Sequence, residues 1–72
     1  MHYVIDAPDA FGKAIAEFRL LRGMSQAALA EACGLNRTYL SGLEQGAATE
    51  VLQRLHAIAE ALDLSITIES RS

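Results

Sequence analysis

Three glycines divide most of this chain into short segments, and a residue able to begin a helix follows each of them closely. Glycine readily adopts the left-handed backbone conformation that ends many helices, and the side chains of Ser, Thr and Asn accept hydrogen bonds from the free amides of a helix start. The three pairs are Gly23 with Ser25, Gly34 with Asn36, and Gly46 with Thr49. The sequence therefore predicts several short helices joined by tight turns.

Apolar residues recur at helical spacing on each side of these breaks. We expect a first helix to begin at residues 7–8, because the proline there suits a first helical turn. Two shorter helices follow between residues 25 and 45, with Leu40 and Leu43 facing the core. The lone cysteine, Cys33, is interpreted as a small buried apolar residue.

The last helical segment, which Thr49 begins, has the longest apolar stripe. Its apolar residues keep the helical period for about three turns, so this segment is the strongest helix prediction in the sequence. Leu20 and Leu21, near the end of the first helix, cannot both face one core, so at least one of them should be exposed. The stripe of the last helix consists of Val51, Leu52, Leu55, Ile58, Ala59 and Leu62.

Two segments have the pattern of β-strands. Residues 2–5 are short, apolar and β-prone, and within residues 64–69 Leu64, Ile66 and Ile68 alternate with polar side chains. An isolated strand leaves its backbone donors and acceptors unpaired, so the second strand needs a partner. That partner is either the first strand of the same chain or a strand of a second chain.

The length of 72 residues allows one domain, 1–72, whose core is barely large enough for stability. The chain lacks a second cysteine for a disulfide, a membrane-spanning apolar run and a signal peptide, so we expect a cytoplasmic protein with no membrane partner. His2, Cys33 and His56 have no metal-ligand spacing, and no catalytic grouping or phosphate loop stands out. We therefore expect no metal, no cofactor and no enzyme activity.

The charge balance, taken alone, argues against nucleic acid as a partner. Six Lys and Arg against nine Asp and Glu give a formal net charge of -3, whereas nucleic-acid-binding proteins usually have a basic excess. Four of the acids lie in the last third of the chain, which leaves room for a local cationic face before it. These four are Glu50, Glu60, Asp63 and Glu69.

Two short helices joined by a glycine turn, between longer flanking helices, resemble the helix-turn-helix unit of DNA-binding proteins. The residues that carry a closer likeness are Phe11, Gly12, Ile15, Phe18, Arg19, Gly23, Met24, Ser25, Gln26, Leu29, Ala30, Gly34, Leu35, Leu40, Ser41, Leu43, Glu44 and Gly46, followed by Leu52, Leu55, Ile58, Ala59 and Leu62. At these positions the chain resembles the Cro/C1-type (XRE, phage-repressor-like) helix-turn-helix family. The resemblance implies an all-α fold, a repressor-like bundle of four to five helices with its helix-turn-helix at about 25–45, and sequence-specific repression of transcription.

Segments near the two ends of the sequence indicate a narrower group within this family. The first strand, the helix start at residues 7–8 and the segment 62–68 are similar to HipB-type antitoxins. That similarity implies a homodimer on a palindromic double-stranded DNA operator, repression of the chain's own operon, and a HipA-like kinase toxin as partner. It also implies dimerisation by the C-terminal strand, which would pair with its twin and bury Leu64, Ile66 and Ile68; pairing with residues 2–5 is the competing arrangement.

In this family the helix that begins at Asn36 lies in the DNA major groove, where its first turn reaches base edges. Arg37 is the first candidate to read a base, because its guanidinium can donate two hydrogen bonds to guanine. Asn36, Thr38 and Ser41 are shorter candidates beside it. Candidates for phosphate contacts are Arg22, Ser25, Gln26, Tyr39 and Gln45.

Arg19 and Glu44 occupy the positions of a partly buried ion pair that ties the first helix to the reading helix in related repressors. Gly42 lies in mid-helix, where glycine costs about 1 kcal/mol relative to Ala, and either a close approach to DNA or neutral drift would explain it. Ala16, Gly42 and Ala47 stand where relatives often have basic or amide side chains, so few phosphate contacts are expected. The alternative function is a protein-interaction module with the same fold and little DNA affinity.

Overall fold

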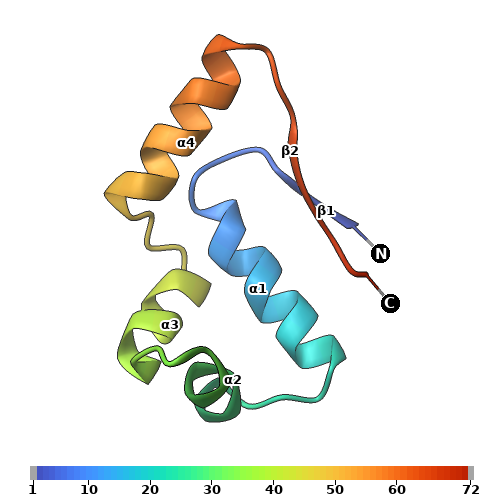
Figure 1. Cartoon of the computed structure of the whole chain (residues 1–72), viewed down its shortest axis with the longest axis vertical. Helices are drawn as coiled ribbons and strands as arrows, with labels where there is room; N and C mark the ends of the chain where they lie inside the picture. The colour runs from blue at the N-terminus through green and yellow to red at the C-terminus, as the bar shows by residue number, and fades with distance from the viewer. Residues whose placement is uncertain (1, 72) are drawn as a thin grey trace.

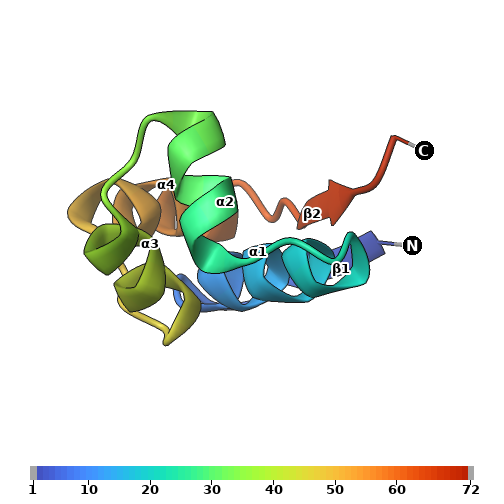
Figure 2. The same ribbon diagram turned by 90° about the horizontal axis from the view of Figure 1, so that it is seen from below.

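The structure, a computed structural model, describes residues 2–71 and is mostly helical, as predicted. Four helices and a two-stranded sheet make up the described part of the chain (Figure 1). The elements, in chain order, are β1 (His2–Ile5), α1 (Ala10–Leu21), α2 (Gln26–Cys33), α3 (Arg37–Glu44), α4 (Glu50–Ala61) and β2 (Ile66–Glu69). α1 lies at the centre, with the sheet on one side and α3 on the other (Figures 1 and 2).

The helix starts and stops read from the sequence are confirmed for α2, α3 and α4. The Ser25 hydroxyl accepts a hydrogen bond from the Ala28 amide at 3.0 Å, and the Asn36 carboxamide oxygen accepts one from the Thr38 amide at 2.7 Å. The Thr49 hydroxyl does the same for α4. Each of these side chains satisfies an amide that has no partner inside its helix.

The start of α1 differs from the prediction. The helix begins at Ala10, after Asp9, and the Asp9 side chain makes no capping hydrogen bond. Its carboxylate instead forms an ion pair with Lys13 at 3.2 Å. Pro8 therefore lies in the turn before the helix, where its missing amide leaves no donor unpaired.

β2 pairs with β1 of the same chain in an antiparallel sheet, with Ile5 opposite Ile66 and Tyr3 opposite Ile68. Ile66 and Ile68 are partly buried against the apolar cluster of β1 and α1, whereas Leu64 precedes the strand and is exposed. β1 therefore supplies the backbone partner of β2, and α1 supplies apolar cover for the two isoleucines. The competing arrangement, pairing within the chain, is the one that forms.

α1 and α3 approach so closely that a side chain at Gly12 has no room. A methyl group on Gly12 would lie 1.6 Å from the carbonyl oxygen of Leu43. The inward positions of α3 are filled as predicted, since Leu40 and Leu43 are both buried. The close packing of α1 on α3 thus depends on the absence of a Cβ at one residue.

α4 departs most from the expected core. Of its apolar residues only Ala59 is buried, while Leu52 is half-buried. The core helix that the family resemblance implies here is therefore only partly buried, because α4 lies at one end of the molecule and no element within residues 2–71 covers its outer face (Figure 1). The exposed members are Val51, Leu55, Ile58 and Leu62, at 53–65% of their full surface.

The exposure of three apolar residues and the length of the helices test further expectations. Leu20 and Leu21 are both exposed, which confirms that at least one of them would be. Cys33 is exposed, so its interpretation as a buried residue is wrong: α2 buries Ala30, and Cys33 lies on its last turn. None of the helices in residues 2–71 is long and apolar enough to cross a membrane.

Candidate nucleic-acid interface

Most residues singled out for DNA contact gather on one face, formed by the start of α2 and the outer side of α3. This face is hollowed by a shallow depression of about 420 Å³. Polar groups from two helices that are consecutive in the chain and pack against each other surround it. The residues that line it are Gln26, Arg37, Thr38, Ser41, Gly42 and Gln45.

Arg37 is the cation of this hollow. It is exposed, and within residues 2–71 its guanidinium forms no hydrogen bond or ion pair. Thr38 beside it is exposed as well, and its amide is held by the cap at Asn36. The capping role occupies the oxygen of the Asn36 side chain and leaves its NH2 group to donate. The first turn of α3 therefore offers donors on an open surface.

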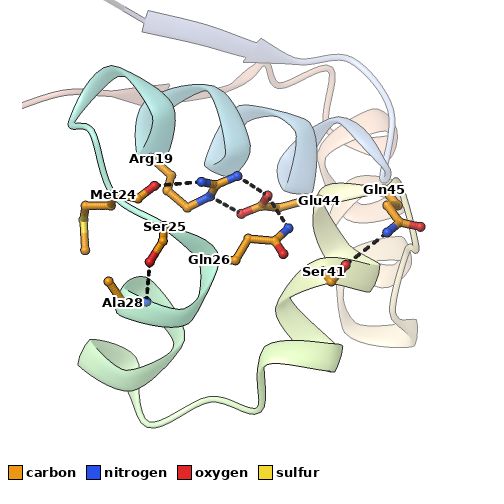
Figure 3. A network of polar contacts seen from close by, with 8 residues as sticks. All are labelled: Arg19, Met24, Ser25, Gln26, Ala28, Ser41, Glu44 and Gln45. Atoms are coloured by element: carbon orange, nitrogen blue, oxygen red, sulfur yellow. Dashed lines mark hydrogen bonds and ion pairs between the residues drawn. The ribbon is translucent and has the colours of Figure 1, made fainter.

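An ion pair between Arg19 of α1 and Glu44 of α3 lies behind the hollow (Figure 3). The Arg19 guanidinium donates to both carboxylate oxygens of Glu44 at 2.8 Å, and a third N–H donates to the Met24 carbonyl at 2.8 Å. Gln26 adds a hydrogen bond from Nε2 to Glu44 Oε1 at 2.9 Å. This network connects α1, the turn before α2, α2 itself and the end of α3.

Burial makes this network a rigid one. The side chains of Arg19 and Glu44 are 11% and 5% exposed, so water screens their attraction only weakly. The hydrogen bond from Arg19 lowers the pKa of the Glu44 carboxyl below its ordinary value, against the opposing effect of desolvation, and the bond from Gln26 adds to the lowering. The pKa of Arg19 is raised, mainly by the same hydrogen bond. Both groups stay charged, and the paired geometry fixes the orientation of α3 relative to α1.

The other candidate residues differ in how they are placed. Ser41 accepts a hydrogen bond from Gln45 at 3.0 Å within the hollow, and Ser25 caps α2 at its edge. Tyr39, which follows Thr38 on α3, is about half exposed. Arg22 is not brought to this face: it lines a separate groove beside β2, where it donates to the Ser70 hydroxyl.

A family model described as helix-turn-helix, of the XRE type, matches residues 15–68 of the chain. The matched range contains the whole α2–turn–α3 unit, the ion pair and both sides of the hollow. The chain belongs to this helix-turn-helix family. No curated protein and no solved structure matches it significantly.

As a helix-turn-helix regulator, the chain is a DNA-binding protein of a regulatory and not a catalytic family. In this motif the second helix of the unit, here α3, enters the major groove, while the first crosses the DNA backbone. α3 carries the hollow on the face turned away from its buried Leu40 and Leu43. Within the part of the chain that the structure describes, no cluster of His, Cys, Asp and Glu could hold a metal ion.

Proposed function

We propose that this helix-turn-helix protein is a sequence-specific transcriptional repressor that reads DNA with the first turn of α3. The observation that carries the proposal is the hollow between α2 and α3, where polar donors surround a cation that makes no ion pair among residues 2–71. An arginine held on a rigid helix can donate two parallel hydrogen bonds to the O6 and N7 atoms of guanine. Arg37 is the residue of this chain best placed to do so.

Shorter side chains support Arg37 in this proposal. Thr38 and Ser41 line the same hollow, and Asn36 keeps an NH2 group for a base edge while its oxygen caps α3. Their reach is shorter than that of Arg37, so they would contact only bases directly beneath the helix start. Contacts of this kind determine which sequence is bound, whereas phosphate contacts determine position.

Phosphate contacts would come from the edges of the hollow. Gln26 has a second N–H on Nε2 besides the one that it donates to Glu44, and Ser25 keeps its hydroxyl proton while its oxygen caps α2. Tyr39 and Gln45 would reach phosphates on the two flanks of α3. Arg22 does not belong to this surface, because it lies in the groove beside β2.

A surface with so few cations would bind weakly as a single copy. Each phosphate that a protein neutralises contributes about 0.9 to the slope of log affinity against log salt, so this protein should have a shallow salt dependence. A homodimer would double the contacts and present two α3 helices about 34 Å apart, one turn of B-DNA. We therefore propose a homodimer on a palindromic operator.

The narrower likeness to HipB-type antitoxins supports a more specific role. In that role the protein represses its own operon and also binds a HipA-like kinase toxin. The exposed Leu20 and Leu21 on α1 offer one apolar surface for such a partner. Co-purification of the chain with the kinase encoded in the same operon tests this part independently of DNA binding.

The DNA-binding proposal is tested by titrating the protein with its own upstream DNA at several salt concentrations. Arg37→Ala should weaken specific binding by about 1 to 3 kcal/mol without changing the fold. The matched control is Arg54→Ala, which removes the same charge from exposed α4, where Arg54 pairs with Glu50. Equal affinities of wild type and Arg37→Ala would contradict the assignment.

The charge of the chain supports a second candidate function. The net charge of -3 favours an interaction module that keeps the fold but binds DNA poorly. The same titration separates the two functions: an interaction module would bind its upstream DNA no better than unrelated DNA at every salt concentration. Gln26→Ala sharpens the result, because loss of a phosphate contact lowers affinity for all sequences equally.

A further inference from the structure

An apolar groove runs between the C-terminal half of α1, the start of α2 and the end of β2. Its volume is about 470 Å³. Ile15 and Phe18 contribute from α1, Met24 and Leu29 from the turn and α2, and Ile68 from β2. These side chains are only partly buried, so the groove is an apolar surface open to solvent.

α4 has the opposite shape, an apolar ridge without a cover. Val51, Leu55, Ile58 and Leu62 follow one another along one side of the helix, each more than half exposed. This ridge is continuous with the face of α4 that Leu52 and Ala59 turn toward the rest of the chain, so the helix has an unusually wide apolar surface of which only part is buried. We infer that the groove and the ridge are the two halves of an interface between two copies of this chain, each copy inserting its α4 ridge into the groove of the other.

Within one chain the two surfaces are kept apart. α2 and the end of α1 lie at one end of the long axis of the molecule, and the C-terminal end of α4 lies at the other (Figure 1). The long axis measures 36 Å. The inner face of α4 is occupied in its first half, where Leu52, His56 and part of the ridge residue Leu55 border a small cavity together with Pro8 and Phe11. The ridge therefore cannot enter the groove of its own chain unless α4 first leaves this position.

Charges on the two surfaces are complementary. Arg22 and Arg71 stand at the rim of the groove, together with the single acid Glu69. At the C-terminal end of α4, Glu60 and Asp63 flank the ridge, and the helix dipole adds partial negative charge at the same end. Insertion of that end into the groove would bring two acids to the arginines, whereas the first turn of α4 has one acid, Glu50, which is paired with Arg54.

Reciprocal insertion gives a two-fold dimer in which each interface residue occurs twice. A stable interface buries about 800 Å² per partner, so such a dimer would need both the ridge and the groove of each copy. The inference deepens the homodimer of the proposed function and rests on it. It also replaces the C-terminal strand by α4 as the element that joins the copies.

Crosslinking between differently labelled copies tests this arrangement without DNA. In a Cys33→Ser background, one copy carries Met24→Cys in the groove and a co-expressed, tagged copy carries Leu62→Cys on the ridge. A short bis-maleimide should join the two copies. The matched control replaces Leu62→Cys with Ala57→Cys, which lies on the exposed opposite side of α4 and should give no crosslink.

Two other outcomes overturn the inference, and a third overturns the proposed function instead. If one chain carrying both Met24→Cys and Leu62→Cys closes a crosslink within itself and sediments as a monomer, α4 folds back onto its own groove. If a dimer persists but the two copies do not crosslink, the copies meet elsewhere, for example at the free edge of β2. If crosslinked dimers form but do not bind upstream DNA, the proposed function fails and the inference stands.

A substitution on the ridge gives an independent measurement. Ile58→Glu should raise the dissociation constant of the dimer by more than about tenfold, because it places a charge in an apolar interface. Ala57→Glu adds the same charge to the outer side of the same helix and should leave the dimer unchanged. Circular dichroism of both variants checks that α4 remains folded, and equal dissociation constants would overturn the inference.

Discussion

The unit formed by α1, α2 and α3 and the region formed by α4 and its following turn are built in opposite ways. In the first, every helix is tied to another by specific contacts: the Arg19–Glu44 ion pair, the bond from Gln26, and the close approach at Gly12. In the second, the ion pair between Arg54 and Glu50 is exposed and most large apolar side chains face solvent. The first unit is complete within one chain, whereas the second leaves most of its large apolar side chains exposed.

The largest effect that would test this comparison is expected at Gly12. Gly12→Ala should destabilise the fold by more than about 3 kcal/mol, because the new methyl group overlaps a backbone carbonyl and forces α1 away from α3. Urea unfolding followed by circular dichroism measures the loss. The control is Gly42→Ala, whose methyl group would meet nothing closer than 4.0 Å. That variant should gain up to about 1 kcal/mol from helix propensity, and a comparable loss in both variants would show that space is not the cause.

Truncation of one leucine in each region compares the two cores directly. Leu40→Ala should cost about 3 kcal/mol, since Leu40 is only 1% exposed and its removal leaves a cavity. Leu55→Ala, at 53% exposed, should cost less than about 1 kcal/mol when the protein is dilute enough to be monomeric. Unfolding curves at low and high protein concentration provide the measurement. Equal costs at low concentration would mean that α4 packs on its own chain in solution.

Acid should lower the stability contributed by the buried Arg19–Glu44 pair more than that contributed by the exposed Arg54–Glu50 pair. The pKa of Glu44 is lower in the folded chain than its ordinary value of 4.5, so its contribution to stability is complete above that value and is lost as the pH falls through the folded pKa. Between pH 5 and strongly acidic conditions, the free energy of unfolding should therefore fall less steeply for Glu44→Gln than for the wild type. The control is Glu50→Gln, which removes an exposed carboxylate of α4 and should leave the pH dependence of the free energy of unfolding as in the wild type. If Glu44→Gln also leaves that dependence unchanged, the buried pair does not determine the acid response.

The smallest expected effect is at the end of α4. Asp63 has a left-handed backbone, with a φ of 57°, in the turn where the Leu64 amide donates to the Ala59 carbonyl at 2.8 Å. Glycine adopts this conformation without the steric cost that a Cβ brings, so Asp63→Gly should stabilise the fold by about 0.5 to 1 kcal/mol. Thermal unfolding can detect the gain. Asp63→Ala, which keeps a Cβ but loses the polar group, is the control and should not stabilise the fold.

The parts of the structure that the sequence predicted well are those that depend on neighbours along the chain. The caps at Ser25, Asn36 and Thr49 are local hydrogen bonds, and the glycine stops are local backbone conformations. The candidate interface was predictable for a related reason: most of its residues come from two adjacent helices in a motif of known docking geometry. The family resemblance also pointed to the Arg19–Glu44 pair.

Features that depend on distant segments were missed. The apolar period of α4 indicated which side of the helix is apolar, but a period contains no information on what covers that side. The contact between Gly12 and the Leu43 carbonyl joins two helices whose distance no local pattern determines. The same is true of Arg22, which the end of the chain brings next to Ser70, away from the other candidate residues.

The pairing of β1 with β2 has a consequence for the order in which the protein is made. His2 lies opposite Glu69, so the sheet joins the earliest and the latest described elements. During synthesis β1 leaves the ribosome before the other described elements and stays unpaired until β2 follows, whereas α1, α2 and α3 find their partners among segments nearer in sequence. The apolar cluster of Ile5, Ala10 and Ala14 is covered by Ile66 and Ile68 only at that last step. Loss of either strand would uncover this cluster, so a cut in β1 or β2 should shorten the lifetime of the folded protein.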